Sequence, residues 1–533
     1  MHFILKQLYY LNDFFNPKYV KKNLSIYREI KTRIENFELP NTQYKLKKKK
    51  IFMMGRSNIS NILMQIPQIL ACLKNNNEII IFLSTPTWSI QLAYKKLGIS
   101  DFIFFYQPFL GTNKISEQLY LDFKNNNFKG IVKYKDINIL KLITSTKLRK
   151  EKKGSIDYRN EFKKSVIKYM TSAIKNVEFA IKMIKLHNPE KFFFEDRGYL
   201  PDGIFFDVAI NYKIDVIEFH AGHKSGILNY KRFNDRNKTQ HPFSVSSDYL
   251  NKLINSNKIN TSINKLVKKE LRYCYQNGEW YDEVGTSFFK KKISKEQFIK
   301  KYNLNPNYPI AIIFTHILYD ATLFYGKDIF LNYEDWLIKT INYIKQIKPI
   351  NWIIKCHPAN EVKNIRDNKS FSEIDTIKSF FGTIPSYVKF IKSSSNESTL
   401  SLYKFIDYCI TVRGTVGIEA ACFGIPVITA GTGRYDNLGF TIDSDSKAEY
   451  FLKLKNIIKY KKYSKKKIDI ATKFAYATLI SKQLKTKAIK FKYLKTKDAK
   501  LDVRINKSRF LIDSEDVVKL SKWLKTKEED LIT

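Results

Sequence analysis

Apolar residues along the chain fall into two alternating patterns. Short continuous apolar runs lie at 51–54, 78–84 and 101–106, and apolar residues three or four positions apart follow the first two of them. Continuous short runs are typical of strands buried on both faces, whereas the wider spacing predicts helices. Strands that alternate with helices in this way predict a parallel sheet with crossover helices on its faces.

The same alternation continues further along the chain. A long helix is predicted at about 159–187, and strands follow at 191–196 and 215–223. After an aromatic-rich stretch the alternation starts again, with strands predicted at 309–317, 351–358, 407–412 and 425–431. The expected fold class is α/β, with two Rossmann-like domains that face a cleft.

These patterns divide the chain into five parts. We expect a helical lead-in (1–44), an N-terminal Rossmann-like domain (45–250), a connection (251–304), a C-terminal Rossmann-like domain (305–455) and a Lys-rich helical tail (456–533). A chain of 533 residues is too long for one hydrophobic core, and its 44% of apolar residues suffices for two.

The charge balance narrows the choice of partner. The chain has 93 Lys and Arg against 51 Asp and Glu, a formal charge of +42, but only 14 of the basic residues are Arg. Specific readers of phosphates and bases favour the planar fork of Arg, so this composition argues against a nucleic-acid partner. Diffuse Lys charge suits an anionic membrane surface better.

Cysteine usage and hydropathy bear on location. The five cysteines are odd in number and have no CxxC spacing, which fits a reducing compartment and argues against a zinc site. The sequence contains no run of 18 apolar residues, so it predicts no transmembrane helix. Lys6 and Asp13 interrupt the apolar start, which lacks the core of a signal peptide. We expect a cytoplasmic protein, peripheral on the inner membrane face.

The strongest chemical signal is the segment DYCITVRGTVGIEAACFGIPVITAG. A buried strand ends in a turn at Arg413 and Gly414, and a helix opens at Thr415. A helix N-terminus at the carboxyl edge of a parallel sheet is an anion site. Gly414 and Gly417 would let a phosphate approach the backbone, Arg413 would add a charged donor, and Glu419 could accept hydrogen bonds from a ribose. The alternative is an ordinary strand-to-helix turn.

A second signal is the segment WIIKCHPAN. Lys355 and His357 stand two positions apart at the end of a predicted strand, so their side chains point to the same side. Both could reach one phosphate, and Pro358 would end the strand. The alternative for His357 is a purely structural histidine.

The order KCHP, RGTVGIEA, GIPVITAG resembles the bacterial capsule polysaccharide biosynthesis proteins, which are GT-B glycosyltransferases of the kind that includes Kdo transferases. The first two elements are also similar to parts of bacterial sialyltransferases and glycerophosphotransferases. The resemblance covers about 305–455. It implies that nucleotide phosphates bind at Lys355, His357, Arg413, Thr415 and Gly417, and that the ribose binds at Glu419.

Two further segments share the resemblance. FTHILYDATLF would place His316 and Asp320 in the cleft, and GRYDNLGF would place Tyr435 and Gly439 there. GT-B enzymes of this kind generally hold the diphosphate without a metal, and no DxD motif stands in a convincing loop. We therefore expect neither a bound metal nor a cofactor.

The N-terminal domain should supply the catalytic base, because the donor pocket is expected in the other domain. A transferase needs a group that deprotonates the acceptor hydroxyl. Asp196 and His220, each at a predicted strand end, are our candidates. Hydrogen-bonded turn residues are the alternative for each cleft candidate of this domain: Glu195, Asp196, Glu218, His220, Gly55 and Arg56. The pair His220 and His223 has no third zinc ligand clearly in place.

The favoured function is transfer of a sugar from a nucleotide-sugar donor to a surface-polysaccharide or glycolipid acceptor. Two alternatives stay open: a nucleotide-sugar 2-epimerase of similar fold, and a non-catalytic, membrane-apposed binding protein. A degenerate relative would have lost Arg413, Glu419 or His357. All three are present, which favours an enzyme.

Overall fold

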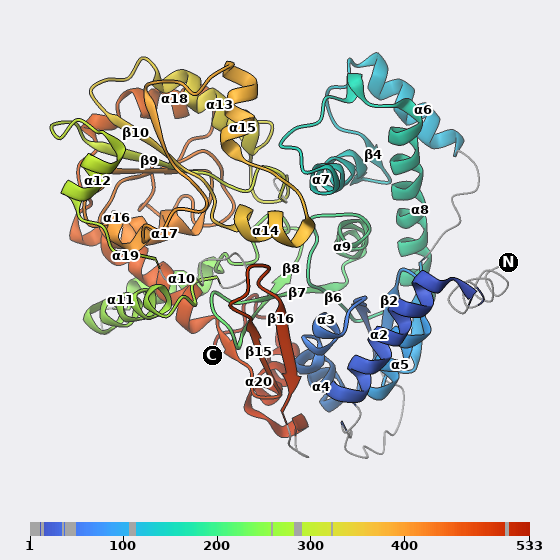
Figure 1. The fold of residues 1–533 in the computed structure, drawn as a ribbon. Coiled ribbons are helices and arrows are strands. Elements are labelled where there is room, and N and C mark those ends of the chain that lie inside the picture. The colour runs from blue at the N-terminus through green and yellow to red at the C-terminus, as the bar shows by residue number, and fades with distance from the viewer. Residues whose placement is uncertain are drawn as a thin grey trace.

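The computed structural model describes residues 11, 15–34, 37, 49–105, 113–256, 260–281, 290–320, 323–506 and 511–533. Half of the expected lead-in (1–44) lies outside these residues. Its described part holds the helix α2 (Pro17–Arg33), which begins after Asn16, whose side chain accepts the Lys18 N–H. Two α/β halves, each built on its own sheet, stand side by side (Figure 1).

The first half is built on a seven-stranded sheet. Its strand order is β14-β8-β7-β6-β1-β2-β3, and β6, β7, β1, β2 and β3 pair in parallel. The strands are β1 (Lys50–Met54), β2 (Glu78–Leu83), β3 (Asp101–Phe104), β6 (Lys191–Phe194), β7 (Asp215–Ala221), β8 (Ile227–Phe233) and β14 (Leu484–Lys485).

One edge of this sheet departs from the predicted parallel arrangement. β8 pairs antiparallel with β7, and β14 pairs antiparallel with β8. A short turn through Gly222 and Gly226 lets β7 double back into β8, so no crossover helix is needed. β14 comes from the part of the chain that was expected to be a helical tail.

The strands β1, β2 and β6 are apolar on both faces, which explains their continuous apolar runs. In β1, Ile51 and Met53 lie in one core, and Phe52 and Met54 lie in the other. The first core includes residues of α4 (Ile66–Lys74), α5 (Trp88–Lys96) and α20 (Glu515–Leu524). The second includes α7 (Ile139–Glu151), α8 (Lys163–His187) and α9 (Asp202–Asn211).

Two stretches of the first half refine the sequence prediction. The helical pattern after β1 breaks into α3 (Ile59–Leu63) and α4, because Pro67 lacks an N–H and stands in the first turn of a new helix. The stretch between β3 and α8, where the sequence analysis places no element, holds α6 (Lys114–Asn125), α7 and a small hairpin of β4 (Lys133–Tyr134) and β5 (Ile137–Asn138).

The second half is built on a five-stranded, wholly parallel sheet of order β11-β10-β9-β12-β13. Its strands are β9 (Ile310–Phe314), β10 (Asn351–Lys355), β11 (Val388–Ile391), β12 (Tyr408–Thr411) and β13 (Val427–Thr429). Its helices are α13 (Tyr333–Ile344), α14 (Ala359–Asp367), α15 (Glu373–Phe381), α16 (Thr399–Leu402), α17 (Thr415–Cys422) and α18 (Lys447–Lys455). Two Rossmann-like domains that face a cleft are confirmed.

The connecting helices pack with the second half. α10 (Ser247–Asn255), α11 (Asn260–Gln276) and α12 (Lys295–Tyr302) contribute side chains to the core beneath α17. α19 (Lys465–Tyr476) packs against both α17 and α11, and the chain then returns to the first half.

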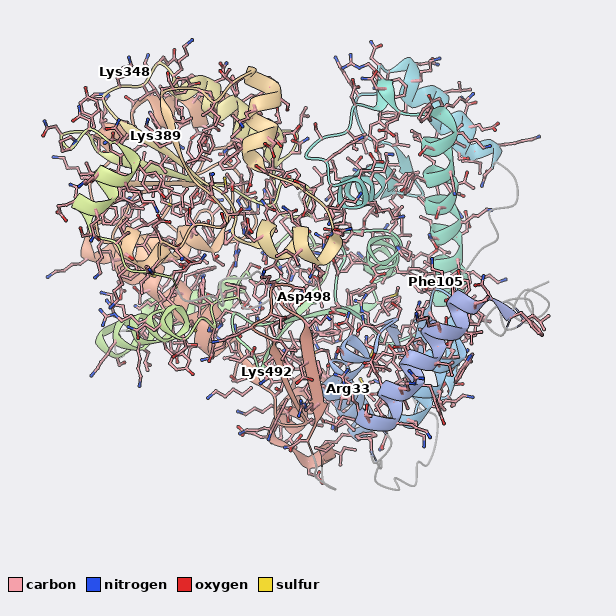
Figure 2. The ribbon with its side chains drawn as sticks, in the orientation of Figure 1. Arg33, Phe105, Lys348, Lys389, Lys492 and Asp498 are labelled. Atoms are coloured by element: carbon pink, nitrogen blue, oxygen red, sulfur yellow. The ribbon has the colours of Figure 1, made fainter. Side chains whose placement is uncertain are left out.

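The C-terminal elements belong to the first half. β14 joins the first sheet, α20 packs on α4, and a hairpin of β15 (Ile489–Tyr493) and β16 (Leu501–Ile505) stands between the two halves (Figure 1). Asp498 lies in the turn of this hairpin (Figure 2). The expected tail (456–533) is therefore only partly helical.

Candidate active site

A cleft of about 1410 Å³ lies between the two halves. Side chains from both sheets and from the β15–β16 hairpin line it. Of the residues singled out from the sequence, these line the cleft: Arg56, Glu195, Asp196, His220, His316, Asp320, Lys355, His357, Arg413, Gly414, Thr415 and Glu419. Strand-end positions on both sheets thus converge, because the carboxyl edges of the parallel strands face each other.

The N-terminus of α17 opens at the floor of the cleft. Gly414 is the N-cap residue, with an extended backbone, and a Cβ on it would lie 3.0 Å from the Thr411 hydroxyl. The Tyr435 hydroxyl donates to the Gly414 carbonyl at 2.8 Å. Tyr435 is buried and does not line the cleft, contrary to expectation.

Gly417 also has a different role from the expected one. A Cβ at this position would lie 2.3 Å from the Tyr435 hydroxyl, so the missing side chain makes room for Tyr435 and not for a phosphate. Gly439 has a φ of +83°, in the left-handed region, and it does not line the cleft. The open face of α17 is formed by the residues of its first turn.

Two arginines stand beside this helix. Arg413 is 2% exposed and pairs with Asp328, while its Nε and Nη1 atoms have no hydrogen-bond partner among the described residues. Arg434, which the sequence analysis missed, lines the cleft, and its Nη1 donates to the Arg413 carbonyl at 3.3 Å. Its position directly before Tyr435, in a segment expected to place residues in the cleft, was the available signal.

Lys355 and His357 lie at the end of β10, as expected. Burial, followed by the charge of Lys290, lowers the pKa of Lys355 to about 8. Burial, followed by the charges of Lys363 and Lys355, lowers the pKa of His357 to about 3. A neutral His357 accepts the Ala359 N–H on Nδ1 at 3.2 Å, so its own proton is on Nε2.

Glu373 holds the backbone of this turn. Its Oε1 accepts the His357 N–H at 2.8 Å and the Thr315 hydroxyl at 2.9 Å. His316 lies beside these residues, stacked on Tyr333 with ring centroids 4.3 Å apart. Its Nε2 is 3.2 Å from the Thr411 hydroxyl, which places it against the start of α17.

Glu419 lies one turn into α17 and is 1% exposed. The hydroxyls of Tyr275 and Tyr403 donate to its Oε2 at 2.5 Å and 3.1 Å, and its Oε1 has no hydrogen-bond partner among the described residues. Burial raises the pKa of Glu419 to about 7. This oxygen is itself buried, directly behind the first turn of α17.

Asp196 and His220 lie on the opposite wall, at the ends of β6 and β7. Burial raises the pKa of Asp196 to about 6, although its Oδ1 accepts the Gly198 N–H at 2.7 Å. Burial disfavours a charged His220, but Glu218, 3.0 Å from its Nε2, raises the pKa of the imidazole overall. Glu218 itself is 1% exposed and lies behind His220, so the expectation that it faces the cleft is wrong.

An ion-pair cluster closes the turn that follows β1. Arg56 Nε lies 2.6 Å from Glu195 Oε2, and Arg56 Nη1 lies 3.3 Å from Asp202 Oδ2. Gly55 does not line the cleft: a Cβ on it would lie 2.5 Å from Leu83 of the neighbouring strand. Arg56 and Glu195 shape the cleft wall, and they are already paired with each other.

Asp320 joins the two halves. Its carboxylate accepts from Arg149 at 2.9 Å and Tyr199 at 2.6 Å in the first half, and from Lys363 at 2.6 Å in the second. Burial opposes ionisation, but Lys363 and Arg149 hold the pKa of Asp320 well below its usual range. Its cleft position is as expected, and its contacts are those of an interdomain tie.

His220 and His223 do not share a site. His223 does not line the cleft, and its Nε2 lies 2.7 Å from Glu270 Oε1. Within the described residues, His223, Glu270 and Cys274 bring potential metal-ligand atoms within 4.8 Å of one another. Lys224 lies 2.5 Å from the same Glu270 oxygen, so that carboxylate already has a cationic partner. The expected absence of a metal stays a prediction.

No protein-family model matches the chain, and no curated protein matches it. Solved structures with a similar chain path include the beta Kdo 2,4 transferase of Thermosulfurimonas dismutans KpsC (11% identity, 53% of this chain, 79% of that chain, TM-score 0.32). Another is UDP-GlcNAc 2-epimerase from Neisseria meningitidis bound to UDP-GlcNAc (13% identity, 81% of this chain, 99% of that chain, TM-score 0.26). A third is a glycosyltransferase from Rickettsia africae (10% identity, 81% of this chain, 95% of that chain, TM-score 0.26). At TM-scores this low, the likeness supports neither membership of a family nor an activity.

Proposed function

We propose that the protein is a GT-B glycosyltransferase that moves a sugar from a nucleotide-sugar donor to a surface-polysaccharide or glycolipid acceptor. The donor would bind to the second half and the acceptor to the first. No metal or cofactor is required in this proposal, because cationic and N–H groups of the chain would hold the diphosphate.

One observation carries the proposal. Lys355, His357 and the arginine pair Arg413 and Arg434 all line one cleft together with the N-terminus of α17. Positive side chains and free helix N–H groups together form a site for an anion. Glu419, which lines the same cleft and has one unpaired carboxyl oxygen, would accept hydrogen bonds from the ribose of a nucleotide.

The opposite wall supports a transfer reaction. Asp196 and His220 line the cleft from the first half, and a carboxylate with a raised pKa is suited to accept a proton. The β15–β16 hairpin extends the cleft beyond these residues, which leaves room for an acceptor. A 2-epimerase acts on its donor alone and has no use for that extension.

A binding screen tests the proposal. Thermal-shift measurements with CMP, CDP, UDP and GDP should show stabilisation by at least one of them, since a ligand that binds only the folded state stabilises it. NMR of the matching nucleotide sugar, incubated without an acceptor, then separates the two reactions. Appearance of the 2-epimer would support the alternative, and no response to any nucleotide would reject both enzymes.

Replacing His357 by Ala should lower kcat/KM for transfer. The fall should correspond to a loss of about 2–3 kcal/mol of transition-state stabilisation, by analogy with one removed oxyanion donor. The reason is that Nε2–H would contact a phosphate that gains negative charge as it leaves. His187, which lies at the end of α8, does not line the cleft, so His187→Ala is the matched control. Unchanged kinetics in the His357 variant would refute the role.

We also propose that α2 contacts an anionic membrane surface. Lys18, Lys21 and Lys22 are exposed on this helix, and Phe15 before it is 79% exposed. Among the helices of the described chain, none is both long and apolar enough to cross a bilayer. This contact would therefore be made at the membrane surface.

Co-sedimentation with vesicles tests that contact. Binding should rise with the fraction of phosphatidylserine and fall with added salt, because salt screens exposed charges. Changing the three lysines to Gln should weaken it, whereas equal pelleting on neutral and anionic vesicles would count against it.

A further inference from the structure

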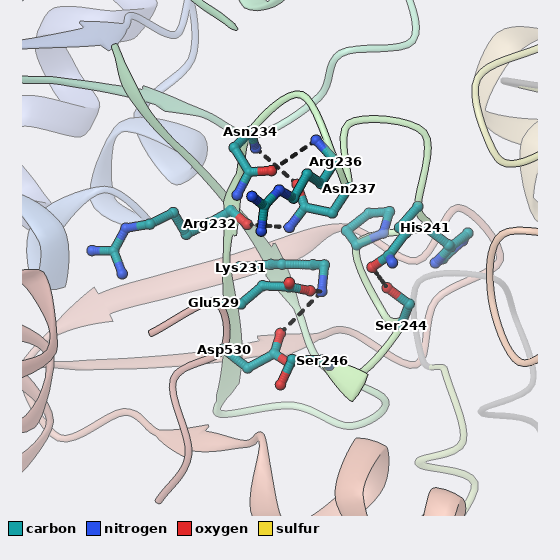
Figure 3. Close-up of polar contacts among 12 residues, drawn as sticks. Lys231, Arg232, Asn234, Arg236, Asn237, His241, Ser244, Ser246, Glu529 and Asp530 are labelled. Carbon is teal, nitrogen blue, oxygen red and sulfur yellow. Dashed lines mark hydrogen bonds and ion pairs between the residues drawn. The ribbon is translucent and has the colours of Figure 1, made fainter. Parts of the chain in front are cut away.

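The loop between β8 and α10 crosses from the first half to the second. The His241 N–H donates to the Gly433 carbonyl at 2.7 Å, and the Gly326 N–H donates to the Thr239 carbonyl at 2.6 Å. The two bonds join the first half to two loops of the second, one between β9 and α13 and one after β13. Figure 3 shows this loop, with His241 beyond the Asn234–Asn237 turn.

The loop is held rigidly on the side of the first half. Arg197 donates to the carbonyls of Lys238 and Gln240. Lys482 donates to the carbonyls of Pro242 and Ser244, at 2.9 Å and 2.7 Å. The positions on either side of His241 are therefore tied to buried cations.

The ring of His241 is fixed as well. It lies against Tyr325 with centroids 4.5 Å apart, and its Nδ1 accepts the Phe243 N–H at 3.0 Å. A neutral ring with an accepting Nδ1 has its proton on Nε2. Nε2 makes no hydrogen bond with any residue that the structure describes, and His241 lines the cleft.

The surroundings of His241 are positively charged. Its backbone bond to Gly433 places it next to Arg434. Burial, followed by the charges of Arg434, His220 and Arg413, holds the pKa of His241 well below 6.5, so the ring is a neutral hydrogen-bond donor. An anion held by these arginines would lie beside an N–H group that has no other partner.

We propose that His241 is a ligand-contacting residue whose Nε2–H donates to an oxygen of the nucleotide diphosphate held by the second half. This inference rests on the proposed function. It gives the first half one donor in the diphosphate site, supplied across the cleft. Such a donor also strengthens its bond as the diphosphate leaves and gains charge.

Isothermal titration with UDP, GDP, CDP and inorganic pyrophosphate tests the inference. His241→Phe keeps a ring that can pack on Tyr325 and removes both ring nitrogens. This change should lower the affinity for the diphosphate about 10- to 100-fold. His241→Gln restores an N–H donor and should recover most of that affinity. His223→Phe, which alters a histidine outside the cleft, should leave affinity unchanged.

A second measurement does not depend on the variants folding. In the unaltered protein, labelled with ¹⁵N in its histidines, the His241 Nε2 resonance should shift when pyrophosphate or the bound nucleotide is added. Equal affinity of the Phe variant, or a resonance that does not move, would overturn the inference and leave the proposed function standing. If the unaltered protein binds CMP but no diphosphate, the inference alone falls; if it binds no nucleotide at all, both fall.

Discussion

Replacing Asp196 by Asn is expected to lower turnover by about 10²–10⁴-fold while nucleotide affinity stays the same. The side chain lies at the end of β6, across the cleft from the anion-binding groups, and it is nearly the same size after the change. An amide cannot accept the acceptor's proton, so the chemical step alone should suffer. The measurement is steady-state transfer alongside nucleotide titration.

The pH profile adds a second test of the same role. Because burial raises the pKa of Asp196 to about 6, turnover should fall as pH drops below that value and the carboxylate becomes protonated. The Asn variant should lose this limb of the profile. His220→Gln is the competing variant: if it abolishes turnover while Asp196→Asn is nearly normal, His220 is the base. Near-normal turnover in both would place the base elsewhere.

Replacing Asp530 by Ala is expected to lower the free energy of unfolding by about 3–5 kcal/mol. Asp530 is 3% exposed, and its Oδ1 lies 2.6 Å from Lys482 and 3.3 Å from Lys231, each 1% exposed. Its Oδ2 accepts the Ser246 N–H at 2.7 Å. Removing the carboxylate leaves Lys482 and Lys231 without their shared partner; Figure 3 shows the contact between Asp530 and Lys231.

Chemical denaturation of the Ala variant measures that loss. Asp513→Ala is a matched control, because Asp513 also pairs with a lysine but is 59% exposed, where an ion pair contributes about 0–1 kcal/mol. If both variants lost the same free energy of unfolding, the contribution of the Asp530 cluster to stability would not depend on its burial. Since the Lys482 contacts hold the His241 loop, the Ala variant should also weaken nucleotide binding.

The sequence was sufficient to locate the cleft edge of the second half. Lys355, His357, Arg413 and Glu419 stand at fixed offsets from strand ends and the helix start, and a parallel sheet brings such positions to one edge. The strand and helix patterns that place these residues are local in the sequence, so no contact with a distant segment was needed to predict their positions.

Residues whose position depends on distant contacts were missed or misassigned. Gly417 faces Tyr435 because a segment that follows β13 folds over α17, which no local pattern reveals. His241 and Arg434 lie in irregular loops, and their place in the cleft depends on backbone bonds between the halves. Loops of this kind carry function without the periodicity that sequence reasoning uses.

The pairing of β14 in the C-terminal part of the chain also could not be predicted from local sequence. Leu484 pairs with Leu228, which stands almost half of the chain earlier, and nothing in the composition around β14 indicates that partner. The sequence analysis expected a Lys-rich helical tail there. Instead Lys482 is buried, because Asp530 compensates its charge.

The late position of β14 and Asp530 sets an order for folding on the ribosome. Residues of the second half, through β13, leave the exit tunnel before the residues that cover β8 and neutralise Lys231. Domains of a growing chain generally fold in sequence order, but this first half cannot complete its sheet in that order. It must wait with one strand edge open while the second half is made, and an open edge of this kind can pair with another chain.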